Sequence, residues 1–175
     1  MRQINKRIIV EDNFFDKKTL NSIHYELMTN NFTNRMADYG NVYGREYFQV
    51  KLNPTHHIAQ LTMKNLRKLF NLKCTDINSQ YVLTTKHSEA KPHCDFLYEF
   101  NCLVYLKGNS IINNGTGFYD KINNNYQLNT HIGFKENRAI IFDPLVYHSS
   151  LQWNEDAGPR YAMLNFVNLI KKNKK

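Results

Sequence analysis

The segment His93-Cys94-Asp95 combines two metal-binding side chains at a spacing that suits one face of a β-strand. Because side chains alternate along a strand, His93 and Asp95 would point to one side and Cys94 to the other. His148 lies far downstream, after an apolar run and a turn. Two histidines and one carboxylate on one face of an iron ion leave three coordination positions open, for two oxygens of a 2-oxo acid and for O₂. A His-x-Asp pattern alone is weak, since it also arises by chance.

Arg160 strengthens this interpretation because it follows His148 and begins the apolar segment Tyr161–Phe166. A hairpin that joins residues 149–153 to residues 160–166 would place Arg160 near the metal. Its guanidinium could then bind the far carboxylate of 2-oxoglutarate through two parallel hydrogen bonds, which a lysine cannot reproduce. The alternatives are a histidine at a strand edge and a solvated surface arginine. The order and spacing of the four residues together favour the metal site.

Two structural parts within one domain are expected to position these residues. Residues 1–75 would form a support, with strands over 6–10 and 46–52, an amphipathic helix over 17–30 and a second helix opened by Pro54. Residues 76–170 contain short β-rich runs separated by turns, at 80–86, 93–96, 102–107, 117–120, 139–143, 149–153 and 160–170. This pattern predicts a mainly β (α+β) fold, a double-stranded β-helix or jelly roll with supporting N-terminal helices.

Three polar or basic stretches lie outside these elements. Residues 31–44 and 109–129 are predicted to be loops, and loops of this kind would select the substrate. The basic run 171–175 is predicted to be a solvated tail.

Composition narrows the function classes. A chain of 175 residues that is 42% hydrophobic and 13% aromatic can bury a core, which excludes whole-chain disorder. The formal charge of +8 would suit acidic ligands or nucleic acid. Three scattered cysteines favour a reducing compartment. Because the apolar run Ile8-Ile9-Val10 is too short for a signal peptide or a membrane span, we expect a cytoplasmic protein, in the host cytoplasm if it is viral.

Several segments together resemble the prolyl 4-hydroxylase-like group of 2-oxoglutarate/Fe(II) oxygenases, particularly small bacterial and phage members. The resemblance covers about residues 80–168 and is carried by five segments: Ala90–Asp95, Leu103–Leu106, Gly115–Tyr119, Asn137–Phe142 with Tyr147-His148-Ser149, and Gly158–Tyr161. It implies that His93, Asp95 and His148 bind the metal and that Arg160 binds the co-substrate. No catalytic residue beyond the metal centre is implied.

The sequence departs from the family pattern at two positions. A hydroxyl residue often lies two positions after the arginine, where this chain has Ala162. One hydrogen bond to 2-oxoglutarate must therefore come from elsewhere, and Tyr81, Thr84 and Tyr105 are the candidates. The glycine often found shortly before the first histidine is also missing, which leaves the conformation of that loop open.

Other chemistry is poorly supported by the remaining residues. The five other histidines are expected to be surface residues: His24, His56, His57, His87 and His131. A zinc site at Cys94, Cys102 and His93 lacks the further cysteine pair that would complete a tetrahedron. Ser149 is not part of a Gly-x-Ser-x-Gly motif, which argues against a hydrolase.

The resemblance implies an enzyme that uses Fe(II), 2-oxoglutarate and O₂, with ascorbate in support, to hydroxylate a substrate and release succinate and CO₂. A peptidyl or free amino acid is the favoured substrate class. The alternatives are a non-catalytic cupin-like module that binds a metal or small ligand, and a nucleobase-directed oxygenase. Arg160 argues against the first. Base demethylases of this fold carry a second arginine on the last strand, and residues 161–170 contain none. A protein, peptide or small-molecule partner is thus expected, with nucleic acid less favoured, no membrane and no indicated oligomeric state.

Overall fold

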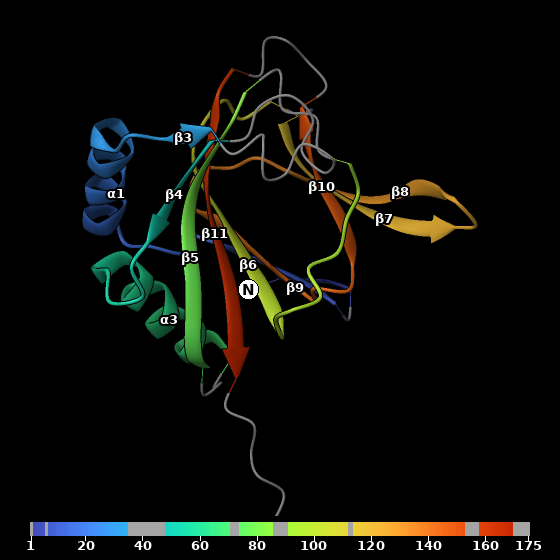
Figure 1. Cartoon of the computed structure of the whole chain (residues 1–175), viewed down its shortest axis with the longest axis horizontal. Helices are drawn as coiled ribbons and strands as arrows, with labels where there is room; N and C mark the ends of the chain where they lie inside the picture. Colours follow the sequence, from blue (N-terminus) through green and yellow to red (C-terminus); the bar gives the residue numbers. More distant parts are fainter. Residues whose placement is uncertain are drawn as a thin grey trace, which may run out of the picture.

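Two antiparallel β-sheets pack against each other in the computed structural model, and two helices cover the outer face of the larger sheet (Figure 1). The structure describes residues 2–5, 7–34, 48–70, 74–85, 91–111, 114–152 and 158–169. The prediction of a mainly β, jelly-roll fold with N-terminal helices is confirmed.

The larger sheet has eight strands in the order β1-β2-β9-β6-β11-β5-β4-β3. Their bounds are β1 Arg2–Asn5, β2 Ile8–Asp12, β3 Thr33–Asn34, β4 Phe48–Leu52, β5 Cys74–Thr84, β6 Phe100–Lys107, β9 Arg138–Phe142 and β11 Arg160–Leu169. β11 lies between β5 and β6 and pairs with both along most of its length. Strands from the N-terminal part of the chain, β2 and β4, thus extend the sheet that the C-terminal part forms.

The smaller sheet has three strands in the order β10-β7-β8. β7 spans Asn114–Ile122, β8 spans Asn125–Gly133 and β10 spans Tyr147–Gln152. Phe118 and Ile132 of this sheet pack with Leu103, Phe142 and Ala162 of the larger sheet in one apolar cluster. This shared core holds the two sheets together.

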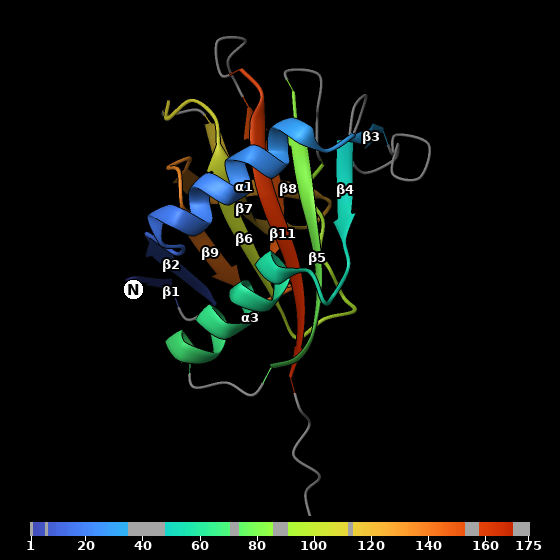
Figure 2. The same ribbon diagram turned by 90° about the vertical axis from the view of Figure 1, so that its left-hand side faces the viewer.

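Helices α1 (Lys17–Thr29) and α3 (His57–Phe70) lie on the other face of the larger sheet (Figure 2). Asp16 caps α1 by accepting a hydrogen bond from the Thr19 backbone N–H at 2.8 Å. Ile23 of α1 and Ile58 of α3 are fully buried against sheet residues such as Val104 and Met163. Among the described residues, no helix is long and apolar enough to span a membrane.

Three predicted elements differ from the structure. Residues 93–96 are not a strand: His93 forms a single bridge to His148, and turns follow. The stretch 109–129 is not a loop throughout, because it contains β7 and much of β8. β10 and β11 do not form a hairpin, since β10 pairs with β7 and β11 pairs with β5 and β6. The chain therefore crosses from the smaller to the larger sheet between them.

Candidate metal and co-substrate site

His93 and His148 come together because backbone hydrogen bonds join their two segments. Each residue donates its N–H to the carbonyl of the other, at 3.1 and 3.0 Å. The Asp95 N–H donates to the carbonyl of Pro144 at 2.9 Å, in the turn that leads into β10. Asp143 stabilises this turn by accepting the backbone N–H of Leu145 at 2.8 Å. The short segment around His93 is thereby held against the end of the smaller sheet.

Both imidazole rings present the same nitrogen to the pocket. The Nδ1 of His93 lies 2.9 Å from the Lys91 carbonyl, and the Nδ1 of His148 lies 3.0 Å from the Val146 carbonyl. Because a carbonyl can only accept, each Nδ1 must carry the proton, which leaves a lone pair on each Nε2. Such hydrogen bonds are the usual outer support of metal-binding histidines.

The three predicted ligands converge. One ligand atom from each of His93, Asp95 and His148 lies within 4.8 Å of the others, and the His148 Nε2 is 3.4 Å from the Asp95 Oδ2. Metal bonds of roughly 2.1 Å at right angles put neighbouring ligand atoms about 3 Å apart. Two imidazole nitrogens and one carboxylate suit Fe(II), so the donor set fits the predicted metal.

The surroundings favour the protonation states that a metal needs. Burial lowers the pKa of His93, and the neighbouring His148 acts in the same direction. For Asp95, burial opposes ionisation, but the hydrogen bond and charge of His148 and the hydrogen bond from Asn101 together lower its pKa. The Asn101 Nδ2 donates to the Asp95 Oδ2 at 2.7 Å. The site thus favours an ionised Asp95 carboxylate beside a neutral His93 ring.

A pocket of about 760 Å³ of empty space, part of it open to solvent, lies between the two sheets. The three predicted ligands and Arg160 all line it. Its other walls include apolar side chains from the larger sheet, such as Leu103, Phe142 and Leu164. The Phe142 ring packs edge-on against the His148 ring, with centroids 4.7 Å apart. One pocket therefore contains a metal-binding triad, a cation and apolar walls.

Arg160 is a buried cation with neutral partners, 4% exposed. Its Nη1 donates to the carbonyl of Gly115 and to the Asn114 Oδ1, and its guanidinium lies 5.5 Å from the centre of the Tyr105 ring. The buried Nε has no hydrogen-bond partner, and no carboxylate among the described residues pairs with Arg160. Burial lowers its pKa, although arginine stays charged at neutral pH. A buried charge of this kind needs an anion.

The three candidates for the extra hydrogen bond lie in different places. Thr84 lines the pocket opposite Arg160 on the neighbouring strand. Tyr105 does not line it: its buried hydroxyl bonds to the Thr116 Oγ1 at 2.7 Å and to the Ile132 carbonyl at 3.2 Å. Tyr81 was wrongly assigned, because its hydroxyl donates to the Glu26 carboxylate at 2.7 Å on the helix side of the sheet.

Several polar side chains that the sequence did not single out also line the pocket, and two of them lie close to the predicted site residues. Thr116 lies on β7 next to the arginine, and Asn101 on β6 supports Asp95. Thr116 falls inside the Gly115–Tyr119 segment, so the resemblance pointed to its neighbourhood. Nothing in the sequence singled out Asn101. His87 lies outside the described residues.

Comparisons with known proteins agree on the fold. No protein-family model and no curated protein sequence matches the chain. A prolyl-4-hydroxylase from Pseudomonas putida matches with a TM-score of 0.66, 11% identity and 95% of each chain covered. HygX from Streptomyces hygroscopicus, with nickel, 2-oxoglutarate and hygromycin B bound, matches with a TM-score of 0.67, 12% identity and 93% and 83% covered.

A prolyl hydroxylase from Trichoplax adhaerens, in complex with a hypoxia-inducible factor peptide fragment, also matches. The TM-score is 0.65 at 12% identity, with 92% of this chain and 83% of that chain covered. The chain therefore has the double-stranded β-helix fold of the prolyl 4-hydroxylase-like 2-oxoglutarate/Fe(II) oxygenases.

Proposed function

We propose that this protein is an Fe(II)- and 2-oxoglutarate-dependent dioxygenase that hydroxylates a peptidyl or free amino acid. The observation that carries the proposal is the pairing, in one pocket, of a His-Asp-His triad with a buried arginine that has no carboxylate partner among the described residues. A module that only held a metal would have no use for that arginine. When bound, Fe(II) with 2-oxoglutarate and O₂ supplies the oxidant that hydroxylates a C–H bond, giving succinate and CO₂.

In this proposal, the protein's own residues position and protect the reacting groups. His93, Asp95 and His148 hold the metal from one side, and the carbonyls behind the rings fix the orientation of both imidazoles. Arg160 binds the far carboxylate of 2-oxoglutarate, with the Thr84 and Thr116 hydroxyls beside it. The apolar walls exclude water from the pocket and so strengthen these charge interactions.

The strand register sets the distance between the metal ligands and Arg160, which 2-oxoglutarate would have to bridge. His148 pairs with Phe118 on β7, and the carbonyl that holds Arg160 belongs to Gly115 on the same strand. Three residues of a strand cover about 10 Å. Because the histidine and arginine side chains both reach into the pocket between these points, a five-carbon dicarboxylate is of suitable length to bridge the metal and the guanidinium.

The test is an anaerobic titration of 2-oxoglutarate into the Fe(II) protein, following the metal-to-ligand charge-transfer absorbance. We expect saturable binding in the wild type. Arg160→Lys keeps the charge but loses one or two charge-assisted hydrogen bonds of roughly 1.5–3 kcal/mol each, which raises Kd about tenfold to ten-thousandfold. Metal content should stay intact in Arg160→Lys and fall in His93→Ala.

Two results would contradict the proposal in different ways. If the wild type shows no such absorbance at millimolar 2-oxoglutarate, the non-catalytic module becomes the better explanation. If Arg160→Lys binds as tightly as the wild type, the oxygenase assignment stands and the role of Arg160 does not. Succinate formation with pools of peptides and amino acids, compared with single-stranded oligonucleotides, then separates the favoured substrate class from nucleobases.

A further inference from the structure

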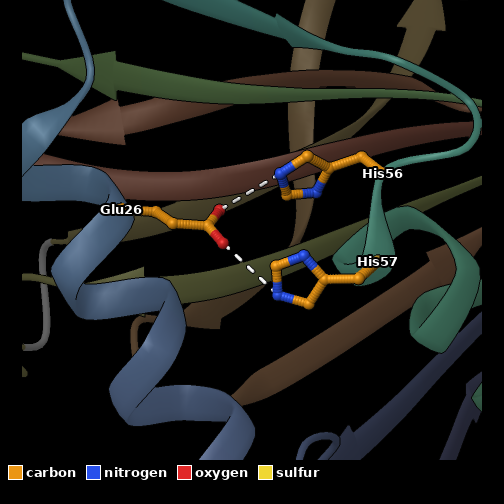
Figure 3. A group of neighbouring side chains, drawn as sticks. All are labelled: Glu26, His56 and His57. Carbon is orange, nitrogen blue, oxygen red and sulfur yellow. Dashed lines mark ion pairs between the residues drawn. The ribbon is translucent and has the colours of Figure 1, made fainter.

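A second group of metal-binding side chains lies on the opposite face of the larger sheet, away from the pocket. Glu26 of α1 points toward His56 and His57, which lie at the start of α3 (Figure 3). The His57 Nε2 is 3.4 Å from the Glu26 Oε1, and the His56 Nε2 is 3.7 Å from the Glu26 Oε2. We propose that these three residues bind a Zn²⁺ ion that fastens α1 to α3.

The three side chains lie close enough together to bind one metal ion. Zinc bonds of roughly 2.0–2.1 Å at tetrahedral angles place neighbouring ligand atoms about 3.4 Å apart. The two observed distances are 3.4 and 3.7 Å, and all three ligand atoms lie within 4.8 Å of one another. Two imidazoles and one carboxylate are a donor set that zinc takes, with water as the fourth ligand.

A hydrogen bond from the sheet side holds the Glu26 carboxylate in place, as is usual for metal-binding carboxylates. The hydroxyl of Tyr81, which is fully buried, donates to the Glu26 Oε2 at 2.7 Å. The Glu26 side chain is only 16% exposed, whereas that of His57 is 56% exposed. The site is thus anchored in the protein on one side and accessible to an ion and to water on the other.

Ion pairing alone explains this arrangement less well. The rings of His56 and His57 lie with their centroids 4.7 Å apart and their planes tilted by 33°, and both turn Nε2 toward one carboxylate. Two imidazole nitrogens turned toward one carboxylate form the kind of donor group that surrounds a metal ion. The Ile58 N–H donates weakly to the His56 Nδ1 at 3.3 Å. Metal binding at Nε2 moves the proton to Nδ1 and gives up this contact.

Cobalt(II) as a substitute for zinc separates this site from the pocket. Four-coordinate cobalt absorbs intensely in the visible, whereas six-coordinate cobalt in a facial triad absorbs weakly. We expect the His93→Ala protein, in which the pocket triad is disabled, to bind one Co²⁺ at pH 8 with the intense spectrum. Adding His57→Gln or Glu26→Gln should abolish that spectrum. His24→Gln is the matched control, because it removes a histidine that lies near Glu26 on α1 but outside the proposed site. It should leave the cobalt spectrum unchanged.

Thermal unfolding gives the second readout. Zn²⁺ should raise the Tm of His93→Ala but not of His93→Ala/His57→Gln, because only the first retains the ligands that bind the folded state. An intense cobalt spectrum that survives His57→Gln, or no intense spectrum in His93→Ala, would overturn the zinc site. Neither result bears on the oxygenase proposal, since 2-oxoglutarate binding is measured in proteins with an intact pocket triad.

Discussion

At the scale of single residues, the pocket is defined by hydrogen bonds behind the side chains that face the metal. Asp95 shows this most clearly, because the same carboxylate oxygen accepts from Asn101 at 2.7 Å and lies 3.4 Å from the His148 Nε2. Asn101 is 4% exposed, so water cannot readily replace its amide. The orientation of the carboxylate therefore depends on a residue that is not itself a candidate ligand.

Replacing Asn101 with alanine should weaken the metal site without removing a ligand. Loss of such outer support typically lowers metal affinity about 10–100-fold. Anaerobic competition titrations with Fe(II) or Mn(II) measure the change. Asn129→Ala is the matched control, because Asn129 makes a similar bond to Asp120 at an exposed site on β8. Equal affinities of Asn101→Ala and wild type would show that Asp95 needs no such support.

Among the strands, β7 contacts both ends of the pocket, because it pairs with His148 at Phe118 and binds Arg160 at Gly115. Close pairing of β7 with β8 requires glycine at position 115. A Cβ on Gly115 would collide with the carbonyl of Ile132 and come within 2.6 Å of the His131 Nε2. The carbonyl of Gly115 holds the Arg160 guanidinium. The pairing of β7 with β8 and the position of the arginine thus depend on the same residue.

Gly115→Ala should therefore cost both stability and co-substrate affinity. Forcing a methyl group into this contact should lower the free energy of unfolding by about 1–3 kcal/mol. Gly133→Ala is the control, because Gly133 pairs with Gly115 and its Cβ would meet nothing closer than 4.0 Å. Denaturant unfolding and 2-oxoglutarate titration test both effects. If Gly115→Ala and Gly133→Ala had the same free energy of unfolding and the same Kd for 2-oxoglutarate, β7 would be able to shift without loss of stability or binding.

Strands β2 and β9, near one edge of the larger sheet, are joined by an ion pair whose contribution to stability depends on pH. Asp12 on β2 accepts hydrogen bonds from Arg138, its cross-strand partner on β9, and from Lys135. The hydrogen bond from Arg138, with the further help of Lys135, lowers the pKa of Asp12 from 3.8 to about 2. A lowered pKa in the folded state means that the stabilisation is present above pH 4 and is lost as pH falls toward 2.

Asp12→Asn should reduce the free energy of unfolding at pH 7 by about 0.5–1 kcal/mol, the upper range for exposed pairs. The difference from wild type should shrink to a small remainder by pH 2, where about half of the wild-type carboxyl is protonated. Urea unfolding across this pH range measures it. Asp76→Asn, at an exposed position of β5, serves as the control. A difference that stays constant down to pH 2 would indicate lost packing and not lost charge.

For the whole molecule, the sequence could predict the fold class from its short β-rich runs. The order of His93, Asp95 and His148 and the family resemblance predicted that these residues lie together. The alternation argument for His93 and Asp95 was wrong, because residues 93–96 do not form a strand.

β8 was not predicted, although Tyr126, Leu128 and Ile132 alternate with polar residues. The asparagine-rich stretch 123–125 suggested a loop, and residues 125–127 are exposed. The sequence also could not predict the crossing between β10 and β11, because strand pairing across long distances is not written in local patterns. Nor could the sequence decide which face of β5 lines the pocket, as Tyr81 and Thr84 show.

Tyr81 and Thr84 lie on one strand at an odd separation, so alternation requires them to face opposite sides. The sequence thus implies that only one of them can reach the pocket. The choice is made by the helices, because Tyr81 packs on the face that α1 and α3 cover and donates to Glu26. The larger sheet therefore separates two faces: one is covered by α1 and α3, and the other lines the pocket.

This division predicts opposite effects for two conservative changes on β5. Thr84→Val removes a hydroxyl that faces the pocket, so the Kd for 2-oxoglutarate should rise about fivefold, the effect of one hydrogen bond of about 1 kcal/mol, while the Tm changes little. Tyr81→Phe leaves the Glu26 carboxylate without its buried donor and should lower stability by about 1 kcal/mol, while 2-oxoglutarate binds normally. Thermal unfolding and the anaerobic titration, run on both variants, give the four values needed. If Tyr81→Phe weakened 2-oxoglutarate binding as much as Thr84→Val, the sheet would transmit changes from one face to the other and would not separate the two sides.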